Sequence, residues 1–456
     1  MAGSDRAPSP RGPRRPRPGG ISIPFVPAPV DPEVETTTLD NGLRVTTVAL
    51  PHLHTATVAA FIKVGSRFEG EDDNGLSHFV EHMLFRGTER FPSSLALNTA
   101  IERLGSTLHA ETGRDYTLLS MGFEPELVPA GLELLGELLT RPRFADIELE
   151  RALVLEEINE DYDEDDIEIN ADDIARGLMF DAHPLGQRII GPRENVEGFS
   201  DADVRAHFAR YYGARNTILC VAGPVRHGDV VEQAARHLAA VPAGAPAIPA
   251  AAPASPGGPR WKHVRDSGAQ TNLAMLFRGV PELDPGYPAF VGLLRALDDG
   301  MSTRLHYQLA DQKGLAYSIG AGIEPLADAA LFEVTGATAN AKLPTLVAEI
   351  LGLLGGLRAD RITDDELAKI RTRYRYETLA SLDDPAAMTG WFGGTALYYP
   401  PQSLSERLAA MARVTADDIV ESARRVLTPS ELVLAAVGAL SKARVGELRE
   451  VVTSWR

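Results

Sequence analysis

The chain contains an internal duplication, and this feature most limits how it can fold. Residues 141–152 (RPRFADIELERA) resemble residues 358–369 (RADRITDDELAK), and residues 211–223 match residues 426–438 over thirteen positions. The repeat distance, roughly 215–220 residues, is far longer than that of solenoid repeats. Both halves also end in a predicted strand that runs to a glycine and then a helix. The duplication therefore predicts two domains of one fold.

A stretch of Ala, Pro and Gly at residues 242–259 separates the two halves, and this composition predicts a linker. We expect a first domain at 34–241 and a second domain at 260–456. Residues 1–33 are rich in Arg and Pro and are expected to form a disordered tail. Prolines interrupt its apolar part, so it lacks the core of a signal peptide and cannot form the amphipathic helix of a transit peptide.

The order of predicted strands and helices indicates an α/β (α+β) fold, with a largely antiparallel sheet packed against helices in each domain. Two similar halves joined by a linker suggest a clam-like chamber, of which this chain would form one half. Segments rich in β-branched residues predict strands, and apolar periodicity predicts helices. The strands expected in the first half are 35–39, 44–50, 57–64, 106–112, 116–123 and 217–222, and the helices are 77–87, 93–104, 125–139, 146–162, 201–212 and 228–238.

The overall charge and the single cysteine exclude several classes of function. The formal net charge of −18 argues against nucleic acid and against an anionic membrane surface as partners. No apolar run approaches the ~18 residues of a membrane-spanning helix. Cys220 is the only cysteine, so no internal disulfide can form, and its apolar neighbours predict a buried side chain. We therefore expect a cytoplasmic protein.

A short helical motif carries the strongest indication of chemistry. Residues 75–88 read GLSHFVEHMLFRGT, and the segment predicts a helix of about three turns, capped by Ser77 and ended by Gly87. Residues four apart share a helix face, so His78 and His82 can direct their imidazoles at one ion. Glu81 would lie beside that ion, where a general base belongs. The order H-x-x-E-H is the inverzincin signature.

The motif alone does not establish a metal site. With 11 His residues in the chain, the pattern arises by chance in roughly one chain in a hundred. Two histidines on an exposed helix face often have no function. A catalytic zinc also requires a third protein ligand and an open fourth position.

The predicted helix at 146–162 offers candidates for that ligand. Glu157 follows Leu153 and Val154 by four and three residues, so it can lie on the inward apolar stripe, and Glu150 lies seven residues earlier on nearly the same line. Glu156 is an alternative, and periodicity does not separate it from Glu157. A carboxylate on an apolar stripe is costly unless a cation pairs with it.

Five segments together resemble the pitrilysin/insulinase family of zinc peptidases, in the branch similar to the mitochondrial processing peptidase. The resemblance covers about residues 34–440. Its segments are HFVEHMLFRGT at 78–88, LGSTLHAETGRDYT at 104–117, ELERALVLEEI at 148–158, HPLGQRIIG at 183–191 and YYGARNTILCVAG at 211–223.

The resemblance implies roles for five residues of the predicted site. It makes Glu157 the third zinc (Zn2+) ligand after His78 and His82, and it assigns Glu150, seven residues earlier, a supporting part in catalysis. Zinc held there would activate water and polarise the scissile carbonyl. Glu81 would accept the proton of the water and pass it to the leaving amine.

The resemblance also implies how peptide is bound. In this family the peptide pairs with an edge strand, which here would be 106–111, with His109 and Ala110 where the family usually has Asn-Ala. The family's second domain carries an Arg and, seven residues later, a Tyr that bind substrate. Tyr317 matches the Tyr, but the Arg position holds Ala310, and Arg304 would face elsewhere.

Because the Arg is missing, we expect the chain to act as a dimer, more specifically as a heterodimer whose partner supplies the Arg–Tyr pair. The expected function is that of a zinc metalloendopeptidase acting on unfolded or oligopeptide substrates. Two alternatives remain open from the sequence. One is a non-catalytic scaffold subunit of the same fold, and the other is a zinc hydrolase of non-peptide substrates.

Overall fold

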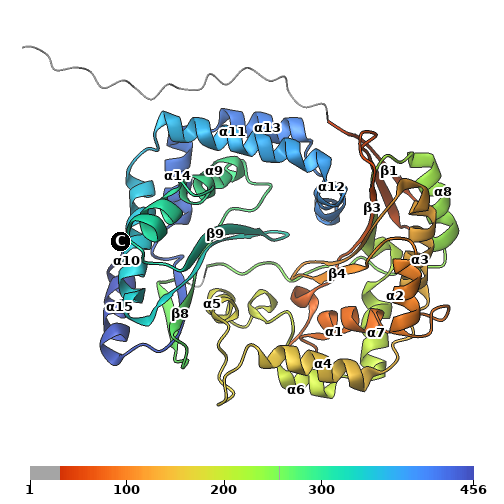
Figure 1. Ribbon diagram of the computed structural model, residues 1–456, viewed down its shortest axis with the longest axis horizontal. Helices are drawn as coiled ribbons and strands as arrows, with labels where there is room; N and C mark the ends of the chain where they lie inside the picture. The colour runs from red at the N-terminus through yellow and green to blue at the C-terminus, as the bar shows by residue number, and fades with distance from the viewer. Residues whose placement is uncertain (1–30, 256) are drawn as a thin grey trace, which may run out of the picture.

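The computed structural model describes residues 31–255 and 257–456, and it contains one β-sheet in each half (Figure 1). The first sheet has the strand order β1-β2-β6-β3-β5-β4 and the second has the order β7-β11-β8-β10-β9. Within each sheet one neighbouring pair is parallel, β2 with β6 and β7 with β11, and the other pairs are antiparallel. The strands are β1 Glu33–Thr38, β2 Arg44–Ala49, β3 Ala56–Ile62, β4 His109–Thr112, β5 Thr117–Phe123, β6 Thr217–Gly223, β7 Arg260–Val264, β8 Gln270–Arg278, β9 Ser318–Pro325, β10 Ala330–Ala339 and β11 Val433–Val437.

The two sheets share one topology, which confirms the two-domain fold predicted from the duplication. If β7 is aligned with β2, the order β7-β11-β8-β10-β9 repeats β2-β6-β3-β5-β4, including the parallel pair. The helix before β6, α7 (Asp201–Tyr211), and the helix before β11, α14 (Ala416–Val426), both begin with a capping box. Each domain is thus a mixed, mostly antiparallel sheet with helices.

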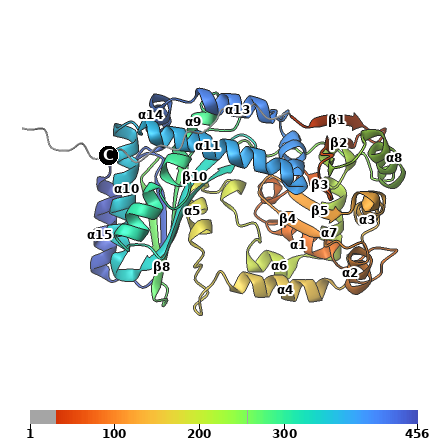
Figure 2. The same cartoon turned by 45° about the horizontal axis from the view of Figure 1, so that its top comes forward.

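Helices flank both sheets and complete the two domains (Figures 1 and 2). The first half contributes α1 Leu76–Leu84, α2 Ser94–Glu102, α3 Val128–Thr140, α4 Ile147–Asn159, α5 Ala171–Phe180, α6 Arg193–Gly198, α7 and α8 His227–Leu238. The second half contributes α9 Tyr287–Leu297, the π-helix η5 Arg304–Gln312, α10 Leu343–Ala359, α11 Asp364–Ala380, α12 Pro385–Thr389, the π-helix η8 Gly390–Gly394, α13 Leu404–Arg413, α14 and α15 Lys442–Ser454.

One face of each sheet is covered by a helix from the other half of the chain. Helix α5 packs its buried residues, among them Ile174 and Met179, on the second sheet, and Figures 1 and 2 both place α5 beside that sheet. In return, Met388 of α12 and Phe392 of η8 pack on the first sheet against Phe61 and Cys220.

These two covering helices occupy equivalent places in the duplication. Asn170 caps α5 and Asp384 caps α12, and the two caps lie 214 positions apart. Each cap side chain accepts hydrogen bonds from two backbone N–H groups of its helix. Each half therefore has its own core on one face of its sheet and depends on the other half to cover the opposite face.

Ion pairs and hydrogen bonds join the two domains beside these helices. Arg67 pairs with Asp115 of the first domain at 3.0 Å and with Asp328 of the second at 2.6 Å. The carboxylate of Asp115 also accepts from the backbone N–H of Ala327 at 2.7 Å, and the backbone carbonyl of Asp115 accepts from the Tyr398 hydroxyl. Removing one member would leave buried charge unpaired, so the network fixes the relative position of the domains.

Most predicted strands and helices of the first half are present, with shifted ends. The strand expected from residue 106 begins only at His109, and β1 begins at Glu33. Residues 242–255 and 257–259 form no helix or strand, and Cys220 is buried as predicted. The tail expected at 1–33 lies, for residues 1–30, outside the described residues. No helix of the described chain is long and apolar enough to span a membrane.

We predict that the two domains unfold together because each covers the other's sheet. Replacing Met388, which is fully buried against the first sheet, by Ala should lower the free energy of unfolding by about 2–5 kcal/mol. Calorimetry should show one transition that moves to lower temperature as a whole. Leu149→Ala, at a position with 52% of the residue exposed, is the control and should change little. Two separate transitions, only one of them shifted, would contradict this coupling.

Candidate metal centre

The helix that carries the histidines, α1, starts in a way the sequence did not indicate. Its N-cap is Gly75, with a left-handed φ of 98°, and the predicted cap Ser77 lies inside the helix. The prediction was wrong because a buried carboxylate from outside the helix takes the capping role. Glu69 accepts from the backbone N–H groups of Gly75 at 2.8 Å and Ser77 at 2.6 Å, and from the side chain of Asn74 at 3.1 Å. An anion at this end also complements the helix dipole.

Helix α1 ends at Leu84, so it is shorter than predicted, and Gly87 turns the chain two residues beyond the C-cap Phe85 with a φ of 110°. Over its length His78 and His82 share one face. Their ring centroids lie 4.6 Å apart.

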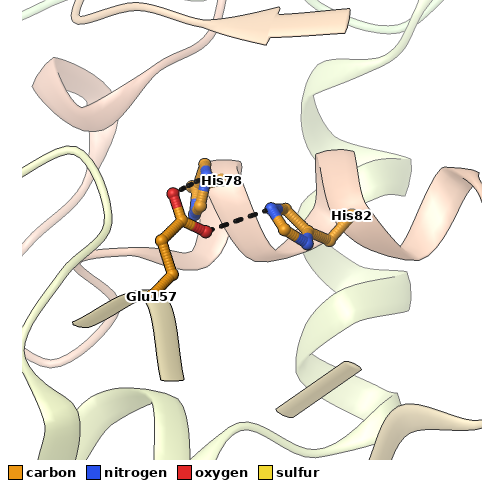
Figure 3. A group of neighbouring side chains, drawn as sticks. All are labelled: His78, His82 and Glu157. Atoms are coloured by element: carbon orange, nitrogen blue, oxygen red, sulfur yellow. Dashed lines mark ion pairs between the residues drawn. The ribbon is translucent and has the colours of Figure 1, made fainter. Parts of the chain in front are cut away.

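The structure brings both histidines to Glu157 of α4 (Figure 3). His78 Nε2 lies 3.8 Å from Glu157 Oε1, and His82 Nε2 lies 3.6 Å from Glu157 Oε2. One donor atom from each of these three residues lies within 4.8 Å of the other two. Glu156 instead accepts from Asn159 at 3.1 Å, in an exposed position.

The inward stripe of α4 differs from the predicted one. Leu149 and Leu153 are 52% and 51% exposed, whereas Glu150, Val154 and Ile158 are buried. The apolar pattern of the sequence was misleading because the helix turns a carboxylate, rather than these leucines, toward α1. Glu157 stands one turn from Val154 on the side that faces the histidines.

Glu150 holds His82 from the side opposite Glu157. Its Oε2 lies 3.3 Å from His82 Nδ1, and its Oε1 pairs with Arg86. Burial alone would raise the pKa of Glu150, but the contacts with His82 and Arg86 outweigh it and lower that pKa. Arg86 was not predicted; it lies two residues beyond the end of α1, from where its guanidinium reaches Glu150.

The hydrogen bond to Glu150 assigns the tautomer of His82. With the Nδ1 proton directed at Glu150, the neutral ring presents the lone pair of Nε2 to Glu157. Burial, and next the nearby His82, lower the pKa of His78 to about 3, so His78 is neutral at pH 7. Its Nδ1 is buried without a hydrogen-bond partner among the described residues.

These three donors fit a divalent zinc ion. Two imidazole nitrogens and one carboxylate oxygen are a ligand set of catalytic zinc, which keeps a fourth position open. Ligands about 2.0–2.1 Å from a tetrahedral zinc lie roughly 3.3 Å apart, close to the 3.6 and 3.8 Å separations between the imidazole nitrogens and Glu157. A cation between these three residues would pair with the Glu157 carboxylate and accept the imidazole lone pairs.

Glu81 lies on α1 next to this group and is tied to the first sheet. Its Oε2 accepts from Thr112 Oγ1 of β4 at 2.5 Å. Burial raises the pKa of Glu81, and the Thr112 hydrogen bond opposes that rise. A bound cation would lower the pKa of Glu81, since it favours the charged form.

The predicted peptide-binding residues lie on two different sheet edges. His109 and Ala110 belong to β4, the last strand of the first sheet, and His109 is exposed. Tyr317 precedes β9, the last strand of the second sheet, and is 83% exposed. Ala310 lies in η5, whereas Arg304 donates to the Ala296 carbonyl at 2.8 Å and pairs with Glu366 at 2.7 Å, so it is engaged within the second domain.

Comparison with known proteins identifies the family. The profile described as Insulinase (Peptidase family M16) matches residues 44–193, which include the metal group, and the profile described as Peptidase M16 inactive domain matches residues 198–374. An uncharacterized zinc protease of Streptomyces coelicolor is 30% identical over 436 residues, which cover 92% of each chain. The chain therefore belongs to peptidase family M16, the insulinase family.

Other M16-like proteins extend the comparison. The probable mitochondrial-processing peptidase subunit beta of Arabidopsis thaliana is 29% identical over 421 residues, covering 89% of this chain and 78% of that protein. A protease from Helicobacter pylori of known crystal structure has the same fold, with a TM-score of 0.80 at 22% identity over 90% of this chain and all of that one. The resemblance read from the sequence is confirmed at the level of the family.

We predict that the purified chain binds about one zinc ion and that Glu157 is a ligand. Elemental analysis should find zinc lost in Glu157→Gln and His78→Ala, since each removes one of three donors. Glu156→Gln, a change of the same kind one position away on α4, should keep its zinc. Full zinc in Glu157→Gln together with loss in Glu156→Gln would make the ligand assignment wrong.

Proposed function

We propose that this chain is a zinc metalloendopeptidase that hydrolyses peptide bonds in unfolded or oligopeptide substrates. The observation that carries the proposal is the convergence of His78, His82 and Glu157, with Glu81 beside them on α1. Relatives named as zinc proteases support it, including the protein of S. coelicolor.

In the proposed reaction each residue of the site has one task. When bound, zinc supplies a Lewis acid that acidifies water and polarises a carbonyl. Glu81 takes the proton from the attacking water and delivers it to the leaving amine. Thr112 orients the carboxylate of Glu81 by its hydrogen bond. Glu150 is a positioning residue, because it acts by fixing the ring and tautomer of His82.

The free edge of β4 is the proposed binding site for the peptide backbone. An edge strand offers unpaired N–H and C=O groups, and an extended peptide can pair with them as an additional strand. Thr112 at one end of β4 contacts Glu81, so a peptide paired along His109 and Ala110 would lead to the catalytic residues. Only a chain with a free backbone can bind in this way, which favours unfolded substrates.

We predict that Glu81→Gln keeps zinc but loses most peptidase activity. The substitution preserves the shape of the side chain and both imidazoles, while it removes the proton acceptor, so kcat on an unstructured peptide should fall roughly 10²–10⁴-fold. Glu89→Gln, an exposed position after the motif, is the matched control. If Glu81→Gln turned over peptide at nearly the wild-type rate, Glu81 could not be the base.

The proposed active unit is a dimer, and specifically a heterodimer whose partner supplies an Arg–Tyr pair. Two features support this assembly. Tyr317 is exposed, and the nearby Arg304 is already bound to Ala296 and Glu366. A relative with 29% identity is named as a subunit, which is consistent with assembly in this family.

We predict that the isolated chain cleaves unstructured peptides slowly. Ala310→Arg should increase kcat/KM when copies of the variant chain associate with one another. A guanidinium can hold a carbonyl in a fixed orientation, whereas the ammonium of Ala310→Lys cannot replace it, so Lys serves as the control. Light scattering would measure the mass against the chain mass of 49.1 kDa. A monomer with full peptidase activity would refute the assembly, and a fully active wild-type homodimer would refute its heterodimeric form.

A further inference from the structure

A cavity of about 420 Å³ lies on the face of the first sheet that is turned away from α1. The side chains of Phe61 and Leu118 form its floor on the sheet, and the covering segment of α12 and η8 forms its roof. Leu326 of the second domain and Tyr398 close its sides. His109 of β4 also lines it, so the cavity reaches the edge strand proposed to bind peptide.

The register of the sheet divides the side chains of β4 between the cavity and the metal centre. His109 pairs with Ser120 of β5, and both line the cavity. Successive side chains of a strand point to opposite faces, so Ala110 and Thr112 point to the side of α1. The contact between Thr112 and Glu81 agrees with this alternation.

A peptide that pairs with β4 would follow the same alternation. The peptide residue opposite His109 would point to the cavity face, because directly opposed residues share a face. The separation between His109 and Thr112, three residues, corresponds to ~10 Å along a strand. The side chain in the cavity would therefore belong to a residue within about three positions of the scissile bond.

The walls of the cavity favour an apolar occupant. Its two acidic groups are already neutralised, since Asp115 pairs with Arg67 and Glu282 pairs with Arg407 and accepts from Tyr399. The remaining lining is aromatic, aliphatic and small. Its volume falls in the range, about 300–1,000 Å³, of pockets that hold small molecules, which is ample for one aromatic side chain.

We propose that this cavity binds a large apolar or aromatic side chain of the peptide paired with β4 and thereby selects the site of cleavage. The inference rests on the proposed peptidase function and adds its specificity. The polar edge of the cavity, from Tyr398 and Ser120, also allows a tyrosine side chain.

Gly390 provides a direct test. It lines the cavity with helical φ and ψ of −60° and −46°, and a Cβ added there would meet no atom within 4 Å. The Cβ of Gly390→Leu is therefore accommodated, and the variant is designed to place its side chain in the cavity. Gly352→Leu, in α10, where an added Cβ also meets nothing within 4 Å, is the matched control. Ser120→Leu fills the cavity from the sheet side and serves as a second variant.

The measurement compares two fluorescent unstructured peptides that differ only in one residue, Phe or Ala, near a cleavage site mapped with the wild-type chain. Binding is measured on zinc-loaded Glu81→Gln protein, which is expected to consume the peptide too slowly to disturb the measurement. We expect the Phe peptide to bind roughly tenfold or more tightly than the Ala peptide, as burial of one aromatic side chain implies. Gly390→Leu or Ser120→Leu should reduce that ratio to below about twofold, and Gly352→Leu should leave it unchanged.

The outcomes separate this inference from the proposed function. Equal binding of the Phe and Ala peptides, or an undiminished ratio in both cavity-filling variants, overturns the inference while peptide cleavage by the wild-type chain stands. If the wild-type chain cleaves no peptide and Glu81→Gln binds none, the proposed function falls and the inference falls with it.

Discussion

The open face of each β-sheet is covered by a helix that belongs to the other half of the chain, and the remaining architecture depends on this exchange. An exposed sheet face carrying side chains such as Phe61 and Cys220 would be an apolar patch in water. Helix α12 and η8 remove that patch from the first sheet, and α5 does the same for the second. The covering segment packs closely on the first sheet, since a Cβ added at Gly393 would lie only 2.5 Å from the Cβ of Cys220. Each duplicated half thus builds its own core on one face of its sheet and relies on the other half to cover the second face.

This fixed frame positions the candidate metal centre. Helix α1 is held at its start by the buried Glu69 and near its end by Glu150, through His82 and Arg86. Both anchors are carboxylates that are buried or nearly so, and each is satisfied by several donors, so the imidazoles have little freedom to turn. The edge strand β4 joins the two functions of the domain. One of its faces contacts the proposed base, and the other borders the cavity beneath η8.

The sequence predicted the two-domain fold, most strands and helices of the first half, and the residues that converge as the metal group. These features depend on local periodicity and on the family motif, which a single chain displays directly. It did not predict features set by contacts between distant segments. Ser77 has the residue type of a cap, but Glu69 displaces it from that role. Leu149 and Leu153 look like core residues, yet both are about half exposed in the structure. The exchange of α5 and α12 also left no local signal, because an amphipathic helix does not specify which sheet it covers.

The exchange of covering helices has a consequence for the order in which the protein is made. All strands of the first sheet have been synthesised once the chain reaches Gly223, the end of β6. The segment that covers the sheet, α12 and η8, ends only at Gly394. Those segments are about 170 residues apart, which a ribosome translates in roughly 10–30 s at ~5–20 residues per second. During this interval the nascent first domain has its strands but lacks α12 and η8, so the side of the sheet that carries Phe61 and Cys220 stays open to water. Chaperone binding to the nascent chain would therefore fall within this window, and it would end when the second half emerges.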